Sequence, residues 1–486
     1  MINPKNLLKF TSDEINSPFL ISDDSEISYG DLKNLLAAAS VYLKSIFEND
    51  EKYIVYLFRN RISLVIYLLA GWQNKIVPVI INPVENKEEI KALTEQTGCR
   101  FILSDIAEEI KDKVPNEVIS ALQVSDLTPA EFSSSQTEEE SAAVVLFTSG
   151  TSGKPSAVEL KFRHLIASTI NAANVFRFNS SDRWLASLPF YHIGGFSIIV
   201  RALYFRSAII IPEELKRSSL CESINKFNPT LLSLVSPQIK TLVDENCSPP
   251  ENLRAVFAGG GFIDYHLASE AAKRGWKINI VYGSTETSSM ITALQEKELF
   301  NIPDSSGKPL PGNEISILNE NYKNLNAYQE GEIAVRGKSV INKYFNDPEA
   351  DKNKFFNGWY LTGDTGYINS EGYLFVTGRK TNLISTGGKK VHPEEVESEI
   401  RKFSFVEDVC VAGKKDPEWG EAITALIVLK NQADAKSDEI ISELKLSLPE
   451  FKIPKIIRFV ESLPHTETGK INRKEVLRII NSDLYL

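Results

Sequence analysis

The chain has 486 residues, of which 42% are hydrophobic and 24% are charged, as is typical of a soluble globular protein. At about 150 residues per domain, this length predicts roughly three domain-sized units and excludes a mini-protein held together by disulfides or metal. The net charge of −10 argues against a protein that wraps nucleic acid, because such a protein needs a basic surface.

Neither the N-terminus nor the cysteines indicate export. The N-terminal segment is polar, unlike a secretory signal, and the apolar stretch from Ile62 to Trp72 is too short to span a bilayer. The four cysteines are far apart and form no CxxC pair, so we expect reduced and mostly buried thiols rather than a disulfide framework or a zinc site. These features predict a cytoplasmic protein without stable membrane insertion.

The first two-thirds of the chain alternate strand and helix. Residues 53–58 predict a buried strand, residues 62–73 an apolar helix and residues 76–81 a second strand. Further strands are expected at residues 100–103, 142–147, 208–211 and 231–235. Because strand–helix–strand units form parallel sheets, we predict a large N-terminal α/β domain of parallel-type sheets with helices.

The pattern changes at about Gly312. Short alternating segments, such as residues 314–318 and 332–335, predict a small β-barrel-like subdomain over about 312–378. The elements expected after it are a helix at 393–401, strands at 406–411 and 422–429, and a helix at about 438–447. They predict a smaller α+β C-terminal domain.

Residues 146–155 join a hydrophobic strand to a loop of hydroxyls, glycines and one lysine. Such a loop can surround phosphates, because glycines let backbone N–H groups approach, hydroxyls donate and lysine supplies charge. It is not a Walker loop, since Pro155 stands where that motif has Ser or Thr. Taken alone, the composition also fits an ordinary Ser/Gly surface turn.

Two later segments carry compatible groups. The sequence Y-G-S-T-E at residues 282–286 can present an aromatic ring, hydroxyls and a carboxylate to a purine, a phosphate and Mg²⁺. In Y-L-T-G-D at residues 360–364, the aspartate can accept hydrogen bonds from ribose hydroxyls, or it can cap a turn.

Five motifs in this order resemble those of the adenylate-forming superfamily of acyl- and aryl-CoA ligases. They are S-G-T-S-G-K-P (149–155), Y-G-S-T-E (282–286), Y-L-T-G-D (360–364), G-R-K-T-N-L-I (378–384) and T-G-K-I (468–471), and they cover nearly the whole chain. The segment S-L-P-F-Y-H-I-G-G-F-S at residues 187–197, followed by Arg201, is similar to that of the o-succinylbenzoate–CoA ligases of menaquinone biosynthesis.

The resemblance implies a two-step reaction. A carboxylic acid reacts with ATP to give an acyl-adenylate and pyrophosphate, and the thiol of coenzyme A then displaces AMP. It implies an AMP-binding domain over residues 1–379 and a mobile C-terminal lid domain over residues 380–486, with a hinge at Lys380 and Thr381. The implied cofactors are ATP, Mg²⁺ and coenzyme A, and the oligomeric state stays open, with a homodimer among the options.

The resemblance also gives each matched position an expected role. The β- and γ-phosphates are assigned to Thr148, Ser149, Gly150, Thr151 and Lys154, and the adenine and ribose to Gly259, Gly260, Gly261, Tyr282, Gly283, Asp364 and Arg379. The catalytic set is Lys470, Thr285, Glu286 and His192, in which Thr285 contacts the α-phosphate, Glu286 holds Mg²⁺ and Lys470 bridges the carboxylate and the α-phosphate. The acid is assigned to His192, Ser197, Arg201 and Gly260, and coenzyme A to Gly387, Gly388 and Lys389.

Some positions depart from the family pattern or keep a second interpretation. Ser156-Ala157 replace a usual Lys-Gly pair, and Lys389-Lys390 replace a usual Glu-Asn pair, so the resemblance fixes neither the loop mobility nor the thiol-side contacts. His192 also fits a structural role, and Arg201 an ordinary surface salt bridge.

Three other functions remain to be compared. A medium-chain fatty-acyl or arylalkanoate CoA ligase would share the motifs but have an apolar acid pocket without a distal cation. A P-loop switch is disfavoured by Pro155. A non-catalytic nucleotide-binding module is disfavoured because Glu286, Asp364 and Lys470 are all present.

Overall fold

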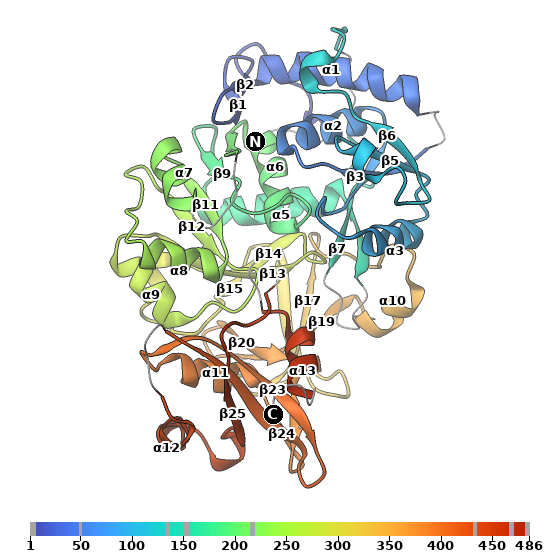
Figure 1. Ribbon diagram of the computed structural model, residues 1–486. Helices are drawn as coiled ribbons and strands as arrows, with labels where there is room; N and C mark the ends of the chain where they lie inside the picture. The colour runs from blue at the N-terminus through green and yellow to red at the C-terminus, as the bar shows by residue number, and fades with distance from the viewer. Residues whose placement is uncertain are drawn as a thin grey trace. The chain divides into compact units, whose positions relative to one another are not determined.

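The computed structural model describes residues 6–47, 51–132, 137–148, 155–213, 219–430, 435–465 and 471–481. Contacts divide the chain into two compact units, one of Met1–Ile315 with Val335–Tyr360 and the other of Ser316–Ala334 with Leu361–Leu486. Figure 1 labels the elements of both units.

The first unit contains a six-stranded sheet in the order β6-β5-β3-β4-β7-β8. Its strands are β3 (Tyr53–Leu57), β4 (Val77–Ile80), β5 (Phe101–Ser104), β6 (Glu117–Ser120), β7 (Ala142–Thr148) and β8 (Ser156–Lys161). All neighbours pair in parallel except β7 and β8, which form an antiparallel hairpin. The predicted strand–helix–strand unit over residues 53–81 is thereby confirmed.

Helices α2 (Arg61–Gln73), α3 (Lys87–Thr97) and α4 (Ala107–Ile110) contact this sheet. Helix α5 (Phe162–Phe176) contacts both this sheet and β14, and α1 (Tyr29–Ile46) contacts β1 and β2. Helices α1 and α2 lie side by side (Figure 1). Helix α2 is buried from Ser63 to Trp72, which explains why this stretch is apolar on every face. Among the described residues, no helix is long and apolar enough to cross a membrane.

A nine-stranded sheet in the same unit has the order β15-β14-β13-β12-β11-β9-β10-β1-β2. Its strands are β1 (Pro18–Ile21), β2 (Glu26–Ser28), β9 (Arg183–Leu185), β10 (Ala208–Ile210), β11 (Leu231–Leu234), β12 (Ala255–Ala258), β13 (Ile278–Ser284), β14 (Ser289–Leu294) and β15 (Lys308–Pro309). The six strands from β13 to β1 pair in parallel, and the outer pairs are antiparallel. Its helices are α6 (Ile193–Phe205), α7 (Leu220–Phe227), α8 (Ser236–Asp244) and α9 (Tyr265–Lys273).

The predicted β-rich region is a five-stranded sheet. It consists of β16 (Asn313–Leu318), β17 (Gly331–Gly337), β18 (Phe355–Phe356), β19 (Trp359–Ile368) and β20 (Leu374–Arg379), with the helix α10 (Pro348–Lys354) before β18. Strand β19 pairs with β17, β18 and β20, because its 10 residues are long enough to face different partners at its two ends. The division between the two units falls within β16, β17 and β19. The predicted domain boundary at residue 379 concerns a hinge and stays a prediction.

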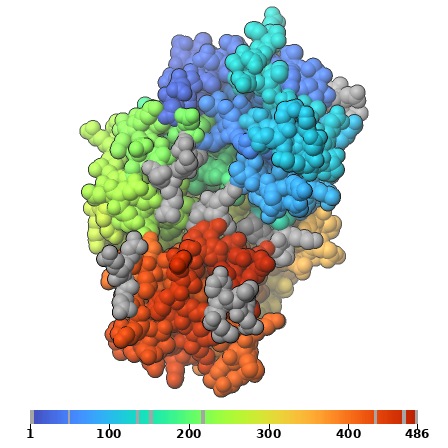
Figure 2. All heavy atoms as spheres, viewed as in Figure 1, coloured from blue at the N-terminus to red at the C-terminus, as the bar shows by residue number. Residues whose placement is uncertain are grey.

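The rest of the second unit is the predicted α+β domain. Its elements are β21 (Ile384–Thr386), β22 (Lys389–Val391), α11 (Pro393–Arg401), β23 (Val406–Asp416), β24 (Gly420–Leu429), α12 (Ser437–Ser447), β25 (Ile456–Phe459) and α13 (Arg473–Asn481). Val396 and Ile400 of α11 are buried in its core, as the helical spacing predicts. On the face drawn in Figure 2, the red residues of the last part of the chain lie at the surface of this unit.

The cysteines differ from expectation. Cys221 at the start of α7 and Cys247 after α8 form a disulfide, with their Cα atoms 5.9 Å apart. The prediction of reduced thiols is therefore wrong for this pair, whereas Cys99 and Cys410 are free and buried. The pairing depends on α7 packing against α8, which a separation of 26 residues in the sequence does not reveal.

We expect the unfolded protein to react with a thiol reagent at Cys99 and Cys410 alone, and at all four cysteines after reduction. Reduction should also lower the free energy of unfolding by about 2–4 kcal/mol, because the cross-link restricts the unfolded chain. Mass spectrometry after alkylation counts the reactive thiols. The variant Cys221→Ser serves as a control, since Cys247 should then react without reductant, and four reactive thiols in the unreduced wild type would contradict the disulfide.

Candidate active site

Several predicted site segments meet at one edge of the nine-stranded sheet. Ser187 comes shortly after β9, Gly259 directly after β12, and Tyr282 lies in the last part of β13. Since β9, β11, β12 and β13 run in parallel, their carboxyl ends point to the same edge. Ligands of open α/β sheets bind at this edge. The structure thus brings the predicted adenine segment to the same side as the predicted acid segment.

The glycines after β12 permit a close approach of two backbones. A Cβ atom at Gly259 would lie 2.7 Å from Val281 Cγ2 and 2.8 Å from the Val281 carbonyl oxygen, so a side chain is excluded there. Gly260 has a φ of 78°, which favours glycine, and both Gly260 and Gly261 are exposed. This bare backbone beside the half-buried Tyr282 fits the predicted adenine position.

Glu286 is a buried carboxylate in the turn between β13 and β14. It is 7% exposed, and its Oε1 accepts a hydrogen bond from the Tyr344 hydroxyl at 2.9 Å. The hydroxyl oxygens of Tyr344 and Tyr360 are 3.2 Å apart. Burial and then the nearby Glu286 charge raise the pKa of Tyr344, which keeps its hydroxyl protonated as a donor. The protonated Tyr344 hydroxyl therefore fixes the orientation of the Glu286 carboxylate.

The turn that carries Glu286 is braced from within. The Thr287 hydroxyl donates to the Ser289 carbonyl oxygen at 2.7 Å, and Ser289 has a φ of 101°. A Cβ atom at Gly283 would lie 2.0 Å from the same carbonyl oxygen. The chain therefore folds back tightly here, which leaves Thr285 half-buried next to the buried Glu286.

Sequence reasoning missed the hydroxyl pair that supports Glu286. Tyr360 was expected only as the first residue of Y-L-T-G-D, and Tyr344 was not expected in the site at all. Tyr344 lies 58 positions after Glu286, in a segment without a motif. Only the folded structure therefore shows that the two side chains are in contact.

Asp364 and Arg379 face each other across the β19–β20 pair. The two residues are register partners, and Arg379 Nε donates to Asp364 Oδ1 at 2.8 Å. The Asp364 backbone N–H donates to the Thr362 hydroxyl at 3.0 Å, which orients the turn at Gly363. The structure thus brings together the two residues that were expected at the ribose, and a carboxylate beside a guanidinium can accept hydrogen bonds from a diol.

The three predicted acid-binding side chains lie on or beside α6. His192 is exposed and immediately precedes the helix, and its ring centre is 4.7 Å from that of Tyr191. Ser197 is buried, and its hydroxyl donates to the Gly194 carbonyl oxygen at 3.2 Å. Ser197 and Arg201 are four positions apart in α6 and therefore share one face of the helix.

Arg201 is 2% exposed. The alternative interpretation of Arg201 as an ordinary surface salt-bridge residue is therefore wrong. Its guanidinium lies 5.2 Å from the Trp184 ring centre and 5.9 Å from that of Phe178, and Nη2 donates to the Ser289 hydroxyl at 3.3 Å. Among the described residues no carboxylate pairs with it, and its Nε has no hydrogen-bond partner. Burial lowers the pKa of Arg201 to about 9. A carboxylate that approached this cation would offset part of that desolvation.

Two parts of the expected machinery lie outside the described residues. They are the phosphate-loop positions Ser149, Gly150, Thr151 and Lys154, and the catalytic Lys470. The ends of the phosphate loop are described: Thr148 closes β7 and pairs in register with Ser156 at the start of β8. The loop therefore begins and ends at neighbouring points of the hairpin, next to the parallel strand β4.

The expected coenzyme A segment is a hairpin turn in the second unit. Gly387 and Gly388 join β21 to β22 with φ values of 55° and 76°, which only glycine adopts readily. The Gly387 N–H donates to the Trp419 carbonyl oxygen at 2.9 Å, and Lys389 Nζ lies 4.2 Å from the Phe451 ring centre. The turn therefore presents a cation beside aromatic rings.

The expected hinge residues begin a short 3₁₀ helix, Lys380–Asn382, after β20. Lys380 Nζ donates to Glu332 Oε2 at 3.0 Å, while Thr381 is exposed. Domain motions usually occur at a few residues at the end of an element, and Lys380 and Thr381 lie at such a place. Their assignment as the hinge stays a prediction.

The donor set around Glu286 fits magnesium. Mg²⁺ prefers oxygen ligands, and a carboxylate has about four acceptor positions, of which the Tyr344 hydroxyl uses one. Among the described residues, the cluster with metal-ligand spacing is Cys221, Glu245 and Cys247, whose two sulfurs are already joined in the disulfide. Glu286 is thus the residue that we expect to bind Mg²⁺ together with substrate phosphates.

Comparison with known proteins agrees with these features. The 2-succinylbenzoate–CoA ligase of Bacillus subtilis is 29% identical over 463 residues, which cover 94% of each chain. The o-succinylbenzoate CoA synthetase of Bacillus subtilis, solved in complex with the acyl-adenylate intermediate OSB-AMP, is 28% identical and superposes with a TM-score of 0.88 over 98% of both chains. The same synthetase solved with ATP and magnesium ion is also 28% identical, with a TM-score of 0.87 over 97% of this chain and 99% of that one.

Two family matches cover most of the sequence. Residues 11–345 match the AMP-binding enzyme family, and residues 395–470 match the AMP-binding enzyme C-terminal domain. The matched residues include β13 and the following Glu286, as well as most of α11 and all of β23 in the second unit. The chain belongs to the AMP-binding enzyme family.

Proposed function

We propose that this protein joins coenzyme A to o-succinylbenzoate at the expense of ATP, through an acyl-adenylate. The observation that carries the proposal is its similarity to a 2-succinylbenzoate–CoA ligase over 94% of both chains. The buried Glu286 and the Asp364–Arg379 pair support it, because they provide the carboxylates that the nucleotide half of the reaction requires.

In the first step, a carboxylate oxygen of the acid attacks the α-phosphorus of ATP and pyrophosphate leaves. An anion attacks a polyanion here, so charge neutralisation and in-line positioning supply most of the rate enhancement. Lys154 and Lys470 supply positive charge, and Thr285 donates to the α-phosphate. Glu286 holds Mg²⁺, which neutralises charge on the phosphates when bound. Asp364 and Arg379 hold the ribose hydroxyls.

In the second step, the sulfur of coenzyme A attacks the acyl carbonyl carbon, the bond to the AMP oxygen breaks so that AMP leaves, and the thiol proton passes to water. We assign the thiol side to the turn of Gly387, Gly388 and Lys389. The lid domain, residues 380–486, thus supplies Lys470 to the first step and this turn to the second, with Lys380 and Thr381 as the hinge between them.

The acid is the most specific part of the proposal. The o-succinylbenzoate dianion has one carboxylate that reacts and one that stays free. We assign the free carboxylate to Arg201, reached directly or through a water, with Ser197 as a second donor once its hydroxyl turns away from the Gly194 carbonyl oxygen. His192 and Gly260 border the reacting end of the acid.

The proposed surroundings of the enzyme follow from its substrates. They are small anions, so nucleic acid and stable membrane insertion are not needed, and a cytoplasmic location fits the supply of ATP and coenzyme A. A homodimer remains an option that an experiment in solution would decide.

A panel of carboxylic acids, assayed for pyrophosphate release with and without coenzyme A, tests the function. We expect o-succinylbenzoate to give the highest kcat/KM. A preference for octanoate-like or arylalkanoate acids would favour the fatty-acyl or arylalkanoate ligase instead. Absence of pyrophosphate release with every acid would favour a non-catalytic nucleotide-binding module.

We expect Arg201→Leu to raise KM for o-succinylbenzoate by about tenfold, the lower end for a charge-assisted hydrogen bond of about 1.5–3 kcal/mol. KM for ATP should stay unchanged, because Asp364 and Glu286 are untouched. Steady-state kinetics with the diacid and with a benzoylpropionate-like monoacid measure the difference. The monoacid is the matched control, and an equal loss for both acids would show that Arg201 only supports the fold.

A further inference from the structure

Two neighbouring helices of the first unit place three metal-binding atoms close together. The Cys221 and Cys247 sulfurs and a Glu245 carboxylate oxygen all lie within 4.8 Å of one another. Cys221 is the second residue of α7, and Glu245 and Cys247 directly follow α8. All three residues lie outside the segments that we assign to ATP, to the acid and to coenzyme A, so the proposed reaction does not use them.

The end of α8 fixes Glu245 and Cys247 through its backbone. The Cys247 N–H donates to the Leu242 carbonyl oxygen at 2.9 Å. The Asn246 N–H donates to the Val243 carbonyl oxygen at 3.2 Å, and Asn246 has a φ of 53°. This pattern is a Schellman motif with Asn246 at the left-handed position. Because its hydrogen bonds join main-chain atoms only, the turn does not depend on the disulfide.

Helix α7 holds Cys221 through its apolar side. Leu220, Ile224 and Phe227 are buried, which attaches the helix to the core of the unit. Cys221 itself is half-buried, and Glu245 is exposed. Packing therefore fixes both sides of the cluster, while an ion can still enter it from solvent.

Thiolates and carboxylates are ligands of zinc. Zn²⁺ binds four ligands, with sulfur at about 2.3 Å and carboxylate oxygen at about 2.0–2.2 Å, so two sulfurs on one tetrahedral ion lie about 3.8 Å apart. Side chains whose Cα atoms are 5.9 Å apart, as those of Cys221 and Cys247 are, can reach that spacing. Two thiolates disfavour Mg²⁺ and Ca²⁺, which prefer oxygen ligands, and a water would complete the four ligands of zinc.

The disulfide and the ion exclude each other, because a metal ligand has to be a thiolate. A small-molecule thiol opens the Cys221–Cys247 bond by exchange: two such thiols are oxidised to their own disulfide and pass two electrons and two protons to the cysteines. When zinc binds, the two cysteine protons pass to water. Reduced thiols are the favoured state in a cytoplasm, the location that we propose for this protein.

We propose that Cys221, Glu245 and Cys247 form a zinc site in the reduced protein. The helix α7 precedes β11 and α8 follows it, so the ion and the disulfide are alternative cross-links around the same strand. The zinc site does not depend on the proposed ligase reaction, and it requires no acid, ATP or coenzyme A.

Zinc binding to the full-length chain tests the site. Protein that has been reduced with a phosphine and then freed of it should take up one Zn²⁺ per chain from a chromogenic chelator, whereas the disulfide form should not. Millimolar Mg²⁺ should not displace the ion, because thiolates select a soft cation. Co²⁺ in place of Zn²⁺ should give the intense near-ultraviolet absorption of cobalt–thiolate bonds, which identifies sulfur as a ligand.

Variants of single residues identify the ligands. Cys221→Ser should weaken zinc binding to the reduced protein by about 100-fold and Glu245→Gln by about tenfold, because the first removes a thiolate and the second only a charge. Glu222→Gln is the matched control for the carboxylate, since Glu222 is exposed beside Cys221 but lies outside the cluster. Cys99→Ser is the control for the thiol, since Cys99 is a free cysteine outside the cluster. Both controls should keep the affinity of the wild type.

Melting curves of the reduced proteins show that each variant is folded. Saturating zinc should raise the melting temperature of the reduced wild type by about 2–5 °C, because the ion binds the folded state. A reduced wild type that takes up no zinc, or Cys221→Ser with unchanged affinity, would overturn the site. Unchanged affinity in Glu245→Gln would overturn the three-ligand assignment, and a Co²⁺ spectrum without the thiolate absorption would place the ion on other ligands.

Discussion

Replacing Lys470 by alanine is expected to lower the rate of acyl-adenylate formation by about 10²–10³-fold, or roughly 3–4 kcal/mol. The reason is that this step brings a carboxylate onto a phosphate, and a positioned ammonium compensates the charge that gathers there. Thioester formation from supplied acyl-adenylate should be largely spared, since that step involves no attack on phosphorus. Single-turnover assays of the two half-reactions measure the effect.

Lys474→Ala is the matched control for this variant. Lys474 is an exposed lysine four positions further along the chain, on α13, so it tests whether any lost charge in this region has the same effect. We expect both half-reactions to keep their rates in the control. Equal damage to both half-reactions in Lys470→Ala would contradict separate use of the lid in the two steps.

Glu286→Gln is expected to lower adenylate formation by about 10²-fold at a fixed, low magnesium concentration and to raise the concentration needed for half-maximal rate. The amide keeps the shape of the side chain and an acceptor for the Tyr344 hydroxyl, but it removes the charge that a hard cation favours. Tyr344→Phe leaves the charge and removes its fixed donor, so a smaller loss of about tenfold is expected. Magnesium titrations of pyrophosphate release distinguish the two.

The control for this pair is Glu296→Gln, which neutralises an exposed glutamate after β14. Melting curves should show that all three variants remain folded. A magnesium requirement in folded Glu286→Gln that matches the wild type would place the metal on other ligands.

The sequence predicted what depends on short-range pattern. The apolar runs at β3, α2 and β4 specify their elements because each buries a whole face, and the glycines and hydroxyls of the motifs specify turns after strands. In the C-terminal domain the predicted strand at 406–411 is only the first half of β23, which continues to Asp416. Its second half contains Lys414 and Lys415, so the apolar alternation that indicates a strand is lost there.

The missed features depend on contacts between distant segments. Tyr344 supports Glu286, Arg473 contacts Glu397, and Cys221 pairs with Cys247, and none of these relations repeats with a helical or strand period. The burial of Arg201 was missed for a related reason. A lone arginine on an apolar helix resembles a solvent-facing one until the aromatic side chains of Phe178 and Trp184 are placed around it.

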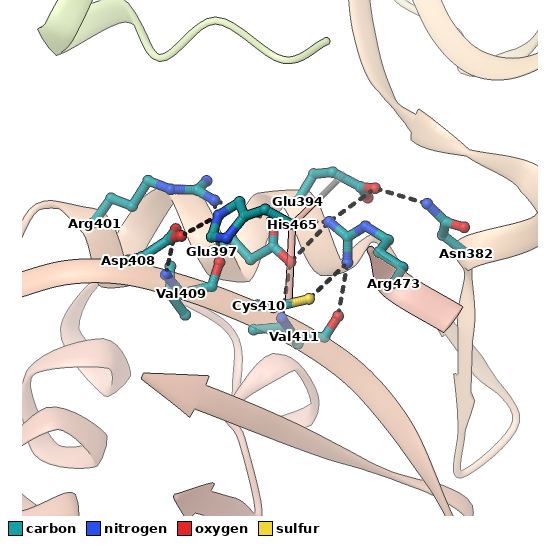
Figure 3. Close-up of polar contacts among 10 residues, drawn as sticks. All are labelled: Asn382, Glu394, Glu397, Arg401, Asp408, Val409, Cys410, Val411, His465 and Arg473. Atoms are coloured by element: carbon teal, nitrogen blue, oxygen red, sulfur yellow. Dashed lines mark hydrogen bonds and ion pairs between the residues drawn. The ribbon is translucent and has the colours of Figure 1, made fainter. Parts of the chain in front are cut away.

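The pairing of Arg473 with Glu397 has a consequence for how the enzyme comes into being on the ribosome. The two residues are 76 positions apart, and Arg473 begins α13, the last helix that the structure describes. Because a nascent chain emerges from its N-terminal end and domains fold as they appear, the residues assigned to ATP are complete long before this contact can form. A chain that stops short of Arg473, through a premature stop codon or C-terminal trimming, would keep the residues that we assign to ATP and lose the Arg473–Glu397 ion pair (Figure 3).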